Sequence, residues 1–206
     1  MKERTEELEV KFYLTQPGLV EKRLKALQAE LAHPRVHEIN LRFDTPEGTL
    51  TREKKVLRLR QDQNAVITFK GPSKPGEEVS IRAEYEINVS SFDMARRILE
   101  ALGYVVAVNY EKYRTDYSYK GTKISMDEMP FGRFMEIEGD NVEVIKEVAG
   151  QLGLDWDARC TESYLQLFAR ICDLRGLPAK NLTFAELAGQ TFAAADFGLR
   201  AADENL

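Results

Sequence analysis

The stretch ELEVK at residues 7–11 alternates charged and apolar residues. Successive side chains of a β-strand point to opposite faces, so Glu7, Glu9 and Lys11 share one face and the apolar residues between them share the other. The alternation continues to Leu14, which predicts a strand over residues 6–14. This strand has one face that carries formal charges of both signs and one face that is suited to a core.

The same pattern recurs along the chain. Charged residues share one face, two or four positions apart, in further predicted strands, and Lys70 ends another; the groups are Arg58 and Arg60; Arg82, Glu84 and Glu86; Lys112 and Arg114; Lys123 and Asp127; Glu136 and Glu138. In any one strand, such a face is typical of a surface exposed to solvent. Across seven strands, a face that is mostly charged favours a closed sheet, with the charges lining its interior and helices covering the apolar outside.

Turn and helix signals divide the remaining sequence. Strands are expected at 39–45, 56–61, 65–70, 81–89, 109–119, 122–127 and 133–138, and helices at 19–31, 92–102, 142–152 and 163–174. The HPRVH segment with His33 and His37 is expected to be a loop. This order of elements predicts an α+β fold in which one antiparallel sheet closes on itself. We expect a domain over 1–174 and a C-terminal appendage over 175–206, which docks through Leu182, Phe184 and Leu187 or stays partly disordered.

The composition narrows the class of protein. The 206 residues carry a net charge of −5, which argues against nucleic-acid and membrane partners because no basic excess attracts phosphate backbones or anionic lipid. Cys160 and Cys172 lack metal-ligand spacing and are expected to be reduced thiols. The first residues, MKERTEELEV, contain no apolar signal-peptide core, so we expect a cytoplasmic location.

Charges of both signs in a confined space have a chemical use. Carboxylates are the ligands that Mg²⁺ and Mn²⁺ prefer, and the candidates for a metal site are Glu7, Glu9, Asp127, Glu136 and Glu138. Lysines and arginines neutralise phosphate groups, and the candidates for substrate binding are Lys11, Arg58, Arg60, Lys70, Lys112 and Arg114. Neither set is stable alone in a closed space, but the two satisfy each other and a bound polyphosphate with its metal.

An ordered set of motifs resembles the CYTH superfamily, which includes class IV adenylyl cyclases and thiamine triphosphatases. The ExExK motif at residues 7–11 is followed by FDTPEGTL, LRLR, ITFKGP, RAEYEI, EKYRTDY, ISMDEMPFGRFMEIEG and ESY, over about residues 5–170. The resemblance implies a closed eight-stranded antiparallel β-barrel, the triphosphate tunnel, with helices packed outside. It also implies that Tyr164 lies at the tunnel mouth.

The resemblance also implies site residues and a cofactor. Glu7, Glu9 and Glu138 match the family's metal-binding glutamates, and five basic residues match its phosphate-binding positions: Lys11, Arg58, Arg60, Lys70 and Arg114. We expect Glu7, Glu9 and Lys11 to act in catalysis with Mg²⁺ or Mn²⁺, on a small-molecule triphosphate. A homodimer is left open.

Three functions remain open at this point. The first is hydrolysis of a nucleoside, thiamine or inorganic triphosphate, which needs only metal, charges and a water molecule. The second is a class IV adenylate cyclase that makes cyclic AMP and pyrophosphate from ATP, and this reaction also requires contacts to the base. We favour hydrolysis, because the aromatic residues Phe69, Tyr85 and Tyr113 are phased onto the outer face. The third is a polyphosphate-binding module without turnover.

Overall fold

The computed structural model describes residues 6–206 of the chain. Its strands are β1 (Glu6–Leu14), β2 (Glu30–Asp44), β3 (Val56–Gln61), β4 (Ala65–Lys70), β5 (Ser80–Val89), β6 (Val105–Tyr119), β7 (Thr122–Met129), β8 (Gly132–Gly139) and β9 (Arg159–Cys160). Its helices are α1 (Pro17–Ala26), α2 (Thr49–Arg52), α3 (Phe92–Ala101), α4 (Val142–Gln151) and α5 (Tyr164–Arg175), with short 3₁₀ turns η1 (Trp156–Ala158) and η2 (Ala194–Phe197).

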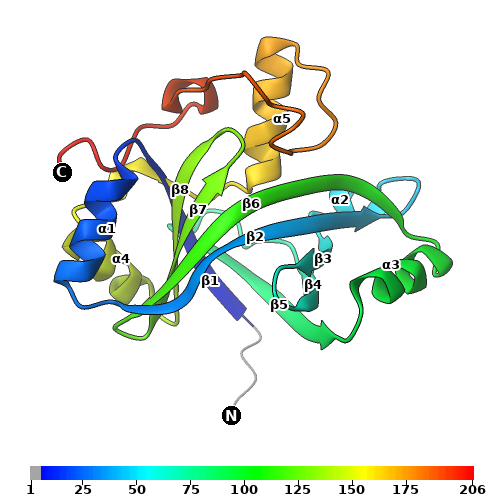
Figure 1. Ribbon diagram of the computed structural model, residues 1–206, viewed down its shortest axis with the longest axis horizontal. Helices are drawn as coiled ribbons and strands as arrows, with labels where there is room; N and C mark the ends of the chain where they lie inside the picture. The colour runs from blue at the N-terminus through cyan, green and yellow to red at the C-terminus, as the bar shows by residue number, and fades with distance from the viewer. Residues whose placement is uncertain (1–5) are drawn as a thin grey trace.

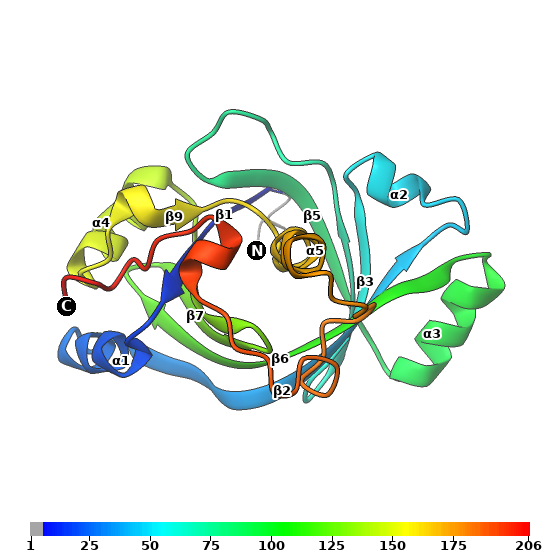
Figure 2. The same ribbon diagram turned by 90° about the horizontal axis from the view of Figure 1, so that it is seen from above.

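The first eight strands of the described chain form a ring. They are antiparallel and follow the order β5-β4-β3-β2-β6-β7-β8-β1, and β1 then pairs with β5 to close the sheet. Figure 1 shows the ring with its helices outside, and Figure 2 looks down on it from above. The predicted closed eight-stranded antiparallel barrel is therefore confirmed. β9 pairs with β1 at Lys11 and Phe12, beyond the point where β5 leaves the β1 edge.

The alternation in β1 sets the two sides of the barrel wall. Val10 and Phe12 are fully buried in a core cluster on the outside of the ring, where they meet Leu24 of α1 and Ile145 of α4. Glu7, Glu9 and Lys11 point the opposite way, into the ring. A shift of pairing by one residue would exchange the two sets, so the apolar outer core also fixes where the inner charges lie.

A second outer cluster holds α3 on the neighbouring wall. Ala95 and Leu99 of α3 pack on Phe43 of β2 and Leu59 of β3. Ser91 caps this helix by accepting a hydrogen bond from the Met94 amide. The helix therefore closes the apolar side of the β2–β3 wall and leaves its inner side to the charged residues.

The structure corrects the start of β2. We expected a strand from Ile39, a helix that extends to Leu31, and a loop at His33 and His37. The helix instead ends at Ala26, where Gln28 takes a left-handed conformation (φ 57°), and β2 runs from Glu30. Register shifts near His33 let the strand carry Pro34 on its way to full pairing with β6. The prediction failed because a bulged strand with a proline lacks clean alternation.

The C-terminal segment 175–206 packs against the barrel. Leu182, Leu187 and Phe197 are buried in a cluster with α5. The Leu182 amide bonds to the Asn109 carbonyl of β6, and the Asp203 carboxylate accepts hydrogen bonds from the Thr15 and Gln16 amides after β1. In Figure 2, α5 and η2 lie over the ring, on the side where the C-terminal chain crosses it.

Candidate functional site

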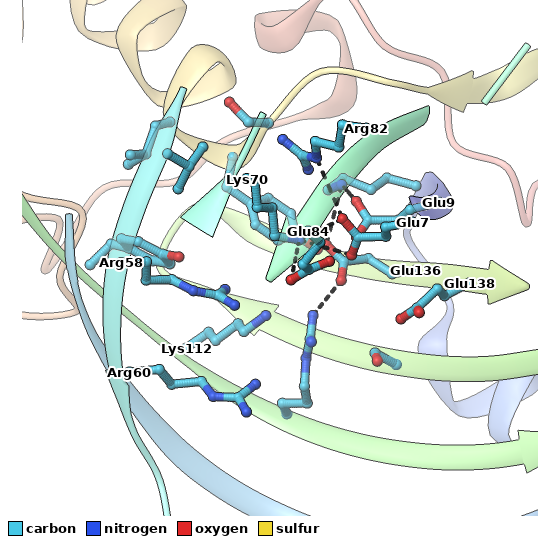
Figure 3. Close-up of a pocket in the computed structure, with 18 of the residues that line it drawn as sticks. Glu7, Glu9, Arg58, Arg60, Lys70, Arg82, Glu84, Lys112, Glu136 and Glu138 are labelled. Atoms are coloured by element: carbon cyan, nitrogen blue, oxygen red, sulfur yellow. Dashed lines mark hydrogen bonds and ion pairs between the residues drawn. The ribbon is translucent and has the colours of Figure 1, made fainter. Parts of the chain in front are cut away.

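The ring encloses a cavity of about 190 Å³ that is lined mainly by charged side chains. Its acidic lining residues include Glu7, Glu9, Glu84, Glu86, Glu136 and Glu138, and its basic lining residues include Lys11, Arg42, Arg58, Arg60, Lys70, Arg82, Lys112, Arg114 and Lys123. Figure 3 shows that five glutamates gather on one side, near β1, while Arg58, Arg60 and Lys112 lie on the other; the five are Glu7, Glu9, Glu84, Glu136 and Glu138. The cavity is therefore polarised across its width.

The acidic side is built on the pairing of β1 with β8. Glu9 lies opposite Glu138 in this ladder, and Lys11 lies opposite Glu136. The Lys11 ammonium donates to the Glu9 carboxylate and lies 3.4 Å from a Glu136 oxygen. Burial opposes the charged form of Lys11, but these two carboxylates outweigh it and raise the pKa of the lysine. Lys11 is therefore held as a cation inside the acidic cluster.

A second acidic group lies where β5 closes the ring. The Lys70 ammonium donates to both oxygens of Glu7 at 2.6 and 2.8 Å, and Arg82 Nε lies 3.4 Å from Glu7. Burial opposes ionisation of Glu7, but these cations lower its pKa. Glu84 lies 3.1 Å from the same lysine. Burial raises the pKa of Glu84 to about 7, and the Glu7 charge adds to the shift. The pair Glu7 and Glu84 thus carries less than two full negative charges near neutral pH.

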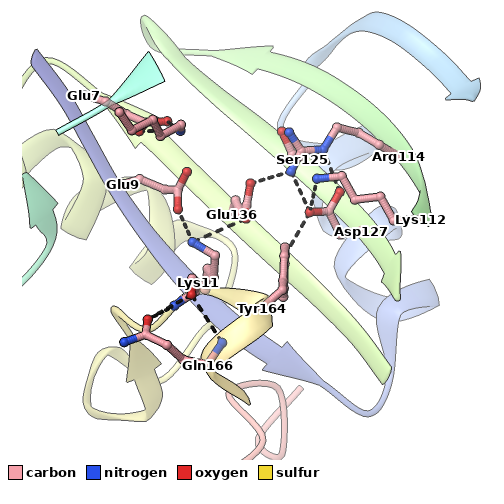
Figure 4. A network of polar contacts seen from close by, with 12 residues as sticks. Glu7, Glu9, Lys11, Lys112, Arg114, Ser125, Asp127, Glu136, Tyr164 and Gln166 are labelled. Carbon is pink, nitrogen blue, oxygen red and sulfur yellow. Dashed lines mark hydrogen bonds and ion pairs between the residues drawn. The ribbon is translucent and has the colours of Figure 1, made fainter. Parts of the chain in front are cut away.

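A buried carboxylate, Asp127, organises the basic side. Its oxygens accept hydrogen bonds from Arg114 (2.5 and 2.6 Å), Lys112 (2.9 Å) and the Tyr164 hydroxyl (2.8 Å), as Figure 4 shows. Arg114 also pairs with Glu136 of β8, which is separated from β6 by β7 alone. Asp127 is 1% exposed and does not line the cavity. Its contacts fix the orientation of Lys112 and Arg114 toward the interior.

Tyr164 begins α5 and covers the interior from the side of this helix. Its ring lies 5.5 Å from the Lys11 ammonium and 5.6 Å from that of Lys112, which are cation–π contacts. Ser163 caps the helix with a reciprocal capping box through Gln166, so the first turn is held in place. The helix N-terminus therefore forms part of the cavity wall.

The donor set is suited to a hard divalent cation. Glu9 and Glu138 face each other across the ladder with Glu136 and Glu7 nearby, and Mg²⁺ is commonly held by one or two carboxylates together with substrate phosphates. No group of three or more acidic, histidine or cysteine side chains within residues 6–206 is arranged as a preformed metal site. Lysine and arginine side chains lie between the carboxylates instead, so the chemistry fits a cation that binds together with phosphate.

The sequence and the fold can now be compared with known proteins. A family model of the CYTH domain matches residues 5–166 of the chain. The chain belongs to the CYTH domain family. The predicted family is thus confirmed, and the match covers the whole ring of strands and the start of α5. No curated protein matches the sequence of this CYTH domain at a significant level.

Solved structures share the fold of this CYTH domain. A candidate adenylate cyclase of Vibrio parahaemolyticus has a TM-score of 0.72 at 24% identity, over 81% of this chain and 98% of that chain. A protein of Pyrococcus horikoshii has a TM-score of 0.68 at 24% identity, over 79% and 98%. A candidate adenylyl cyclase of Hippeastrum, described as having a dominant triphosphatase activity, has a TM-score of 0.58 at 20% identity, over 79% and 95%. At these identities the likeness shows the fold alone.

The CYTH domain places most of the predicted site residues around one cavity. The lining includes Glu7, Glu9, Lys11, Arg58, Arg60, Lys70, Lys112, Arg114, Glu136 and Glu138. Asp127, which we expected among the metal ligands, is not among the lining residues, and its carboxylate accepts hydrogen bonds from Lys112, Arg114 and Tyr164. Phe69, Tyr85 and Tyr113 are absent from the lining, in agreement with their predicted outward phase.

The sequence analysis missed the inner face of β2. Glu38 is 2% exposed and lies 3.6 Å from Lys112 and 3.9 Å from Arg60. Burial opposes its ionisation, but Lys112, Arg114 and Arg60 lower the pKa of Glu38 to about 2. Arg42 lines the cavity two positions after Asn40. The alternation of residues 37–44 (HEINLRFD) could have revealed this face, but the loop expected at HPRVH led us to begin the strand only at Ile39.

No helix within residues 6–206 is both long and apolar enough to cross a membrane.

Proposed function

We propose that this CYTH domain is a divalent-metal-dependent enzyme that hydrolyses the triphosphate group of a small molecule. The observation that carries the proposal is the polarised cavity, with glutamates of β1 and β8 facing cations of β2, β3 and β6 inside one closed sheet. Buried charges of this density are stable only when each is paired. Here they pair with one another, and a polyphosphate with its metal can replace those partners without leaving a charge uncompensated.

Each wall has a distinct role in the proposal. Lys11, Lys70, Lys112, Arg58, Arg60 and Arg114 bind phosphate oxygens, the arginines by paired N–H groups. Glu7, Glu9, Glu136 and Glu138 hold the cation, and Asp127 orients Lys112 and Arg114 rather than ligating metal. When bound, Mg²⁺ or Mn²⁺ withdraws charge from the phosphate oxygens and increases the acidity of bound water. Glu7, Glu9 and Lys11 touch the reacting groups.

The site can neutralise charge without rearranging its backbone. Its cations are already oriented by carboxylates, so no reorganisation of the wall is needed as charge develops on the transferred phosphoryl group. Lys11 is held as a cation by Glu9 and Glu136 and can stay charged while it contacts phosphate. Tyr164 at the start of α5 restricts the access of bulk water to the interior.

The size of the cavity favours hydrolysis over cyclisation. A volume of about 190 Å³ is below the range of roughly 300–1,000 Å³ that pockets for drug-sized ligands occupy. It suits a phosphate chain, with the organic group outside. Cyclisation requires the ribose 3′-hydroxyl to be held in line with the innermost phosphorus, and therefore needs the nucleoside inside as well. The dominant triphosphatase activity of the structurally similar Hippeastrum protein supports the same choice.

Product analysis tests the proposal. The protein is incubated with ATP and with inorganic tripolyphosphate, each with Mg²⁺ or Mn²⁺, and orthophosphate, pyrophosphate and cyclic AMP are measured. We expect metal-dependent release of orthophosphate without cyclic AMP. If cyclic AMP and pyrophosphate form in equal amounts instead, the reaction is cyclisation and the proposal of hydrolysis is wrong. If ATP or tripolyphosphate raises the Tm of the protein but neither is turned over, the protein is a binding module.

A further inference from the structure

One cation in the cavity differs from all the others. Each of the other lysines and arginines of the lining lies within 3.5 Å of a carboxylate, as in the pairs Lys70–Glu7 and Arg114–Asp127. Arg42 has no such partner among residues 6–206. Its one hydrogen bond is from a terminal nitrogen to the Lys55 carbonyl at 2.7 Å. The wall is thus compensated everywhere except at this guanidinium.

The surroundings of Arg42 increase its need for an anion. Arg42 lies opposite Arg58 in the β2–β3 ladder, so two guanidinium groups share one face of adjacent strands. The Nε atoms of both are buried without a hydrogen-bond partner. Burial lowers the pKa of Arg42, Tyr110 and Asp44 oppose this shift, and the neighbouring Arg82 and Arg58 add to it. An arginine still remains charged in such a site, so its charge requires a counterion.

The polar residues on either side along β2 make no direct hydrogen bond or ion pair with this guanidinium within residues 6–206. Asp44 is 3% exposed, and its oxygens accept hydrogen bonds from the Thr45, Leu50 and Thr51 amides, which hold the turn at α2. Asn40 is fully buried, and both polar atoms of its side chain lack a partner. Orphaned polar atoms thus extend from Asn40 to Arg42 and across to Arg58.

We propose that Arg42, beside the triphosphate-binding Arg58, forms a subsite for a phosphoryl group beyond the three of a triphosphate. The guanidinium presents paired N–H donors that match phosphate oxygens, and the orphaned Nε atoms supply further donors. This proposal rests on the proposed phosphohydrolase function, because the remaining cations bind the first three phosphates. The added group is either the fourth phosphate of a longer chain or a free inorganic phosphate.

The length of the phosphate chain distinguishes these cases. We compare kcat/KM for inorganic tripolyphosphate and tetrapolyphosphate in the wild type, in Arg42→Gln, and in Arg97→Gln, which removes an exposed arginine of α3. For a longer chain, the wild type accepts tetrapolyphosphate at least as well as tripolyphosphate. Arg42→Gln then lowers the tetrapolyphosphate-to-tripolyphosphate ratio by about tenfold, as expected for one charge-assisted contact, and Arg97→Gln does not.

A thermal-shift arm covers free phosphate. If the ligand is free, millimolar inorganic phosphate raises the Tm of the wild type in the presence of tripolyphosphate, and Arg42→Gln abolishes that rise while the ratio of rates stays constant. The proposal is overturned when neither the ratio nor the phosphate-dependent Tm changes in Arg42→Gln, or when the wild type rejects tetrapolyphosphate and shows no phosphate effect. If the wild type turns over neither polyphosphate, the proposed hydrolysis is wrong. The subsite is then tested by binding alone: tetrapolyphosphate should raise the Tm of the wild type more than that of Arg42→Gln, and equal shifts overturn the subsite.

Discussion

Glu9 of β1 and Glu138 of β8 are directly opposed in an antiparallel ladder, with both side chains facing the interior of the barrel. Opposed residues of such a ladder have Cβ atoms about 4.5–5.5 Å apart, and like charges at this spacing destabilise the sheet. Lys11, the next inward residue of β1, donates to Glu9. The two carboxylates are therefore held close together by the pairing of the backbone, which is the arrangement that a divalent cation stabilises.

Loss of either carboxylate should strongly reduce metal-dependent turnover. We expect Glu9→Gln and Glu138→Gln to lower kcat/KM for tripolyphosphate by about two orders of magnitude, as for other groups that stabilise charge in a transition state. The fold should survive, because glutamine has the same shape. Steady-state kinetics over a Mg²⁺ series test this, with the exposed Glu143→Gln on α4 as the matched control. Wild-type rates in both variants with EDTA present would end the case for a metal enzyme.

Removal of a lining arginine should affect binding and stability in opposite directions. Arg58 faces Arg42 and has one carboxylate contact, to Glu86 at 3.4 Å. We expect Arg58→Met to leave the Tm equal or higher, because a buried repulsion is relieved, while it reduces the Tm increase caused by tripolyphosphate. A ligand at 100 times its Kd stabilises a protein by about 2.7 kcal/mol, so the wild-type shift is measurable. If tripolyphosphate does not change the Tm of the wild-type protein, the proposed phosphate-binding site is wrong.

Glu84 should make the metal-free protein less stable as the pH rises toward neutrality. Its pKa is raised from 4.5 to about 7, so between these values the folded state holds a proton that the unfolded state has lost. Stability therefore falls as the pH increases through this window, by roughly 3 kcal/mol in total. Urea denaturation with EDTA at pH 5, 6, 7 and 8 measures the effect. Glu84→Gln should flatten the profile, and an unchanged slope in this variant would assign it to other groups.

The contact of Asp203 with the end of β1 should stabilise the whole barrel. Its carboxylate is fully buried and accepts hydrogen bonds from the Thr15 amide and hydroxyl and from the Gln16 amide. Asp203→Ala leaves these donors unpaired and should lower the free energy of unfolding by about 2–4 kcal/mol. Chemical denaturation tests this, with the exposed Asp173→Ala as control. Equal stability of the two variants would show that residues 175–206 are an independent appendage.

The sequence was sufficient for the barrel because its strands alternate cleanly. In β1, charged and apolar residues alternate from Glu7 to Phe12, and the capped helix α3 and the hairpin turns bounded the elements between the strands. The same alternation placed most candidate site residues on one inner face. These positions depend only on the two-residue period of a strand and on closure of the sheet.

Features that depend on tertiary contacts were not predictable. Asp127 shares the inward phase of a ligand, but its burial behind Arg114 and Tyr164 follows from how β7 and α5 meet. Glu38 was hidden because it lies before the predicted strand 39–45, in the irregular first part of β2, whereas Arg42 lies within that strand and its inward phase could have been read from it. The docking of Asp203 joins residues 188 positions apart in the chain, and no local pattern reports such a contact.

The ion pairs of Lys11 should couple the binding of a cation in the cavity to the binding of an anion. A cation that takes the carboxylates of Glu9 and Glu136 releases the Lys11 ammonium, and an anion that takes the ammonium releases both carboxylates. Each ligand thus prepares the binding groups of the other. Coupling between two binding equilibria is reciprocal, so metal must tighten phosphate binding by the same factor by which phosphate tightens metal binding. Under the proposed function, the barrel should therefore respond to metal and phosphate together more steeply than to either one alone.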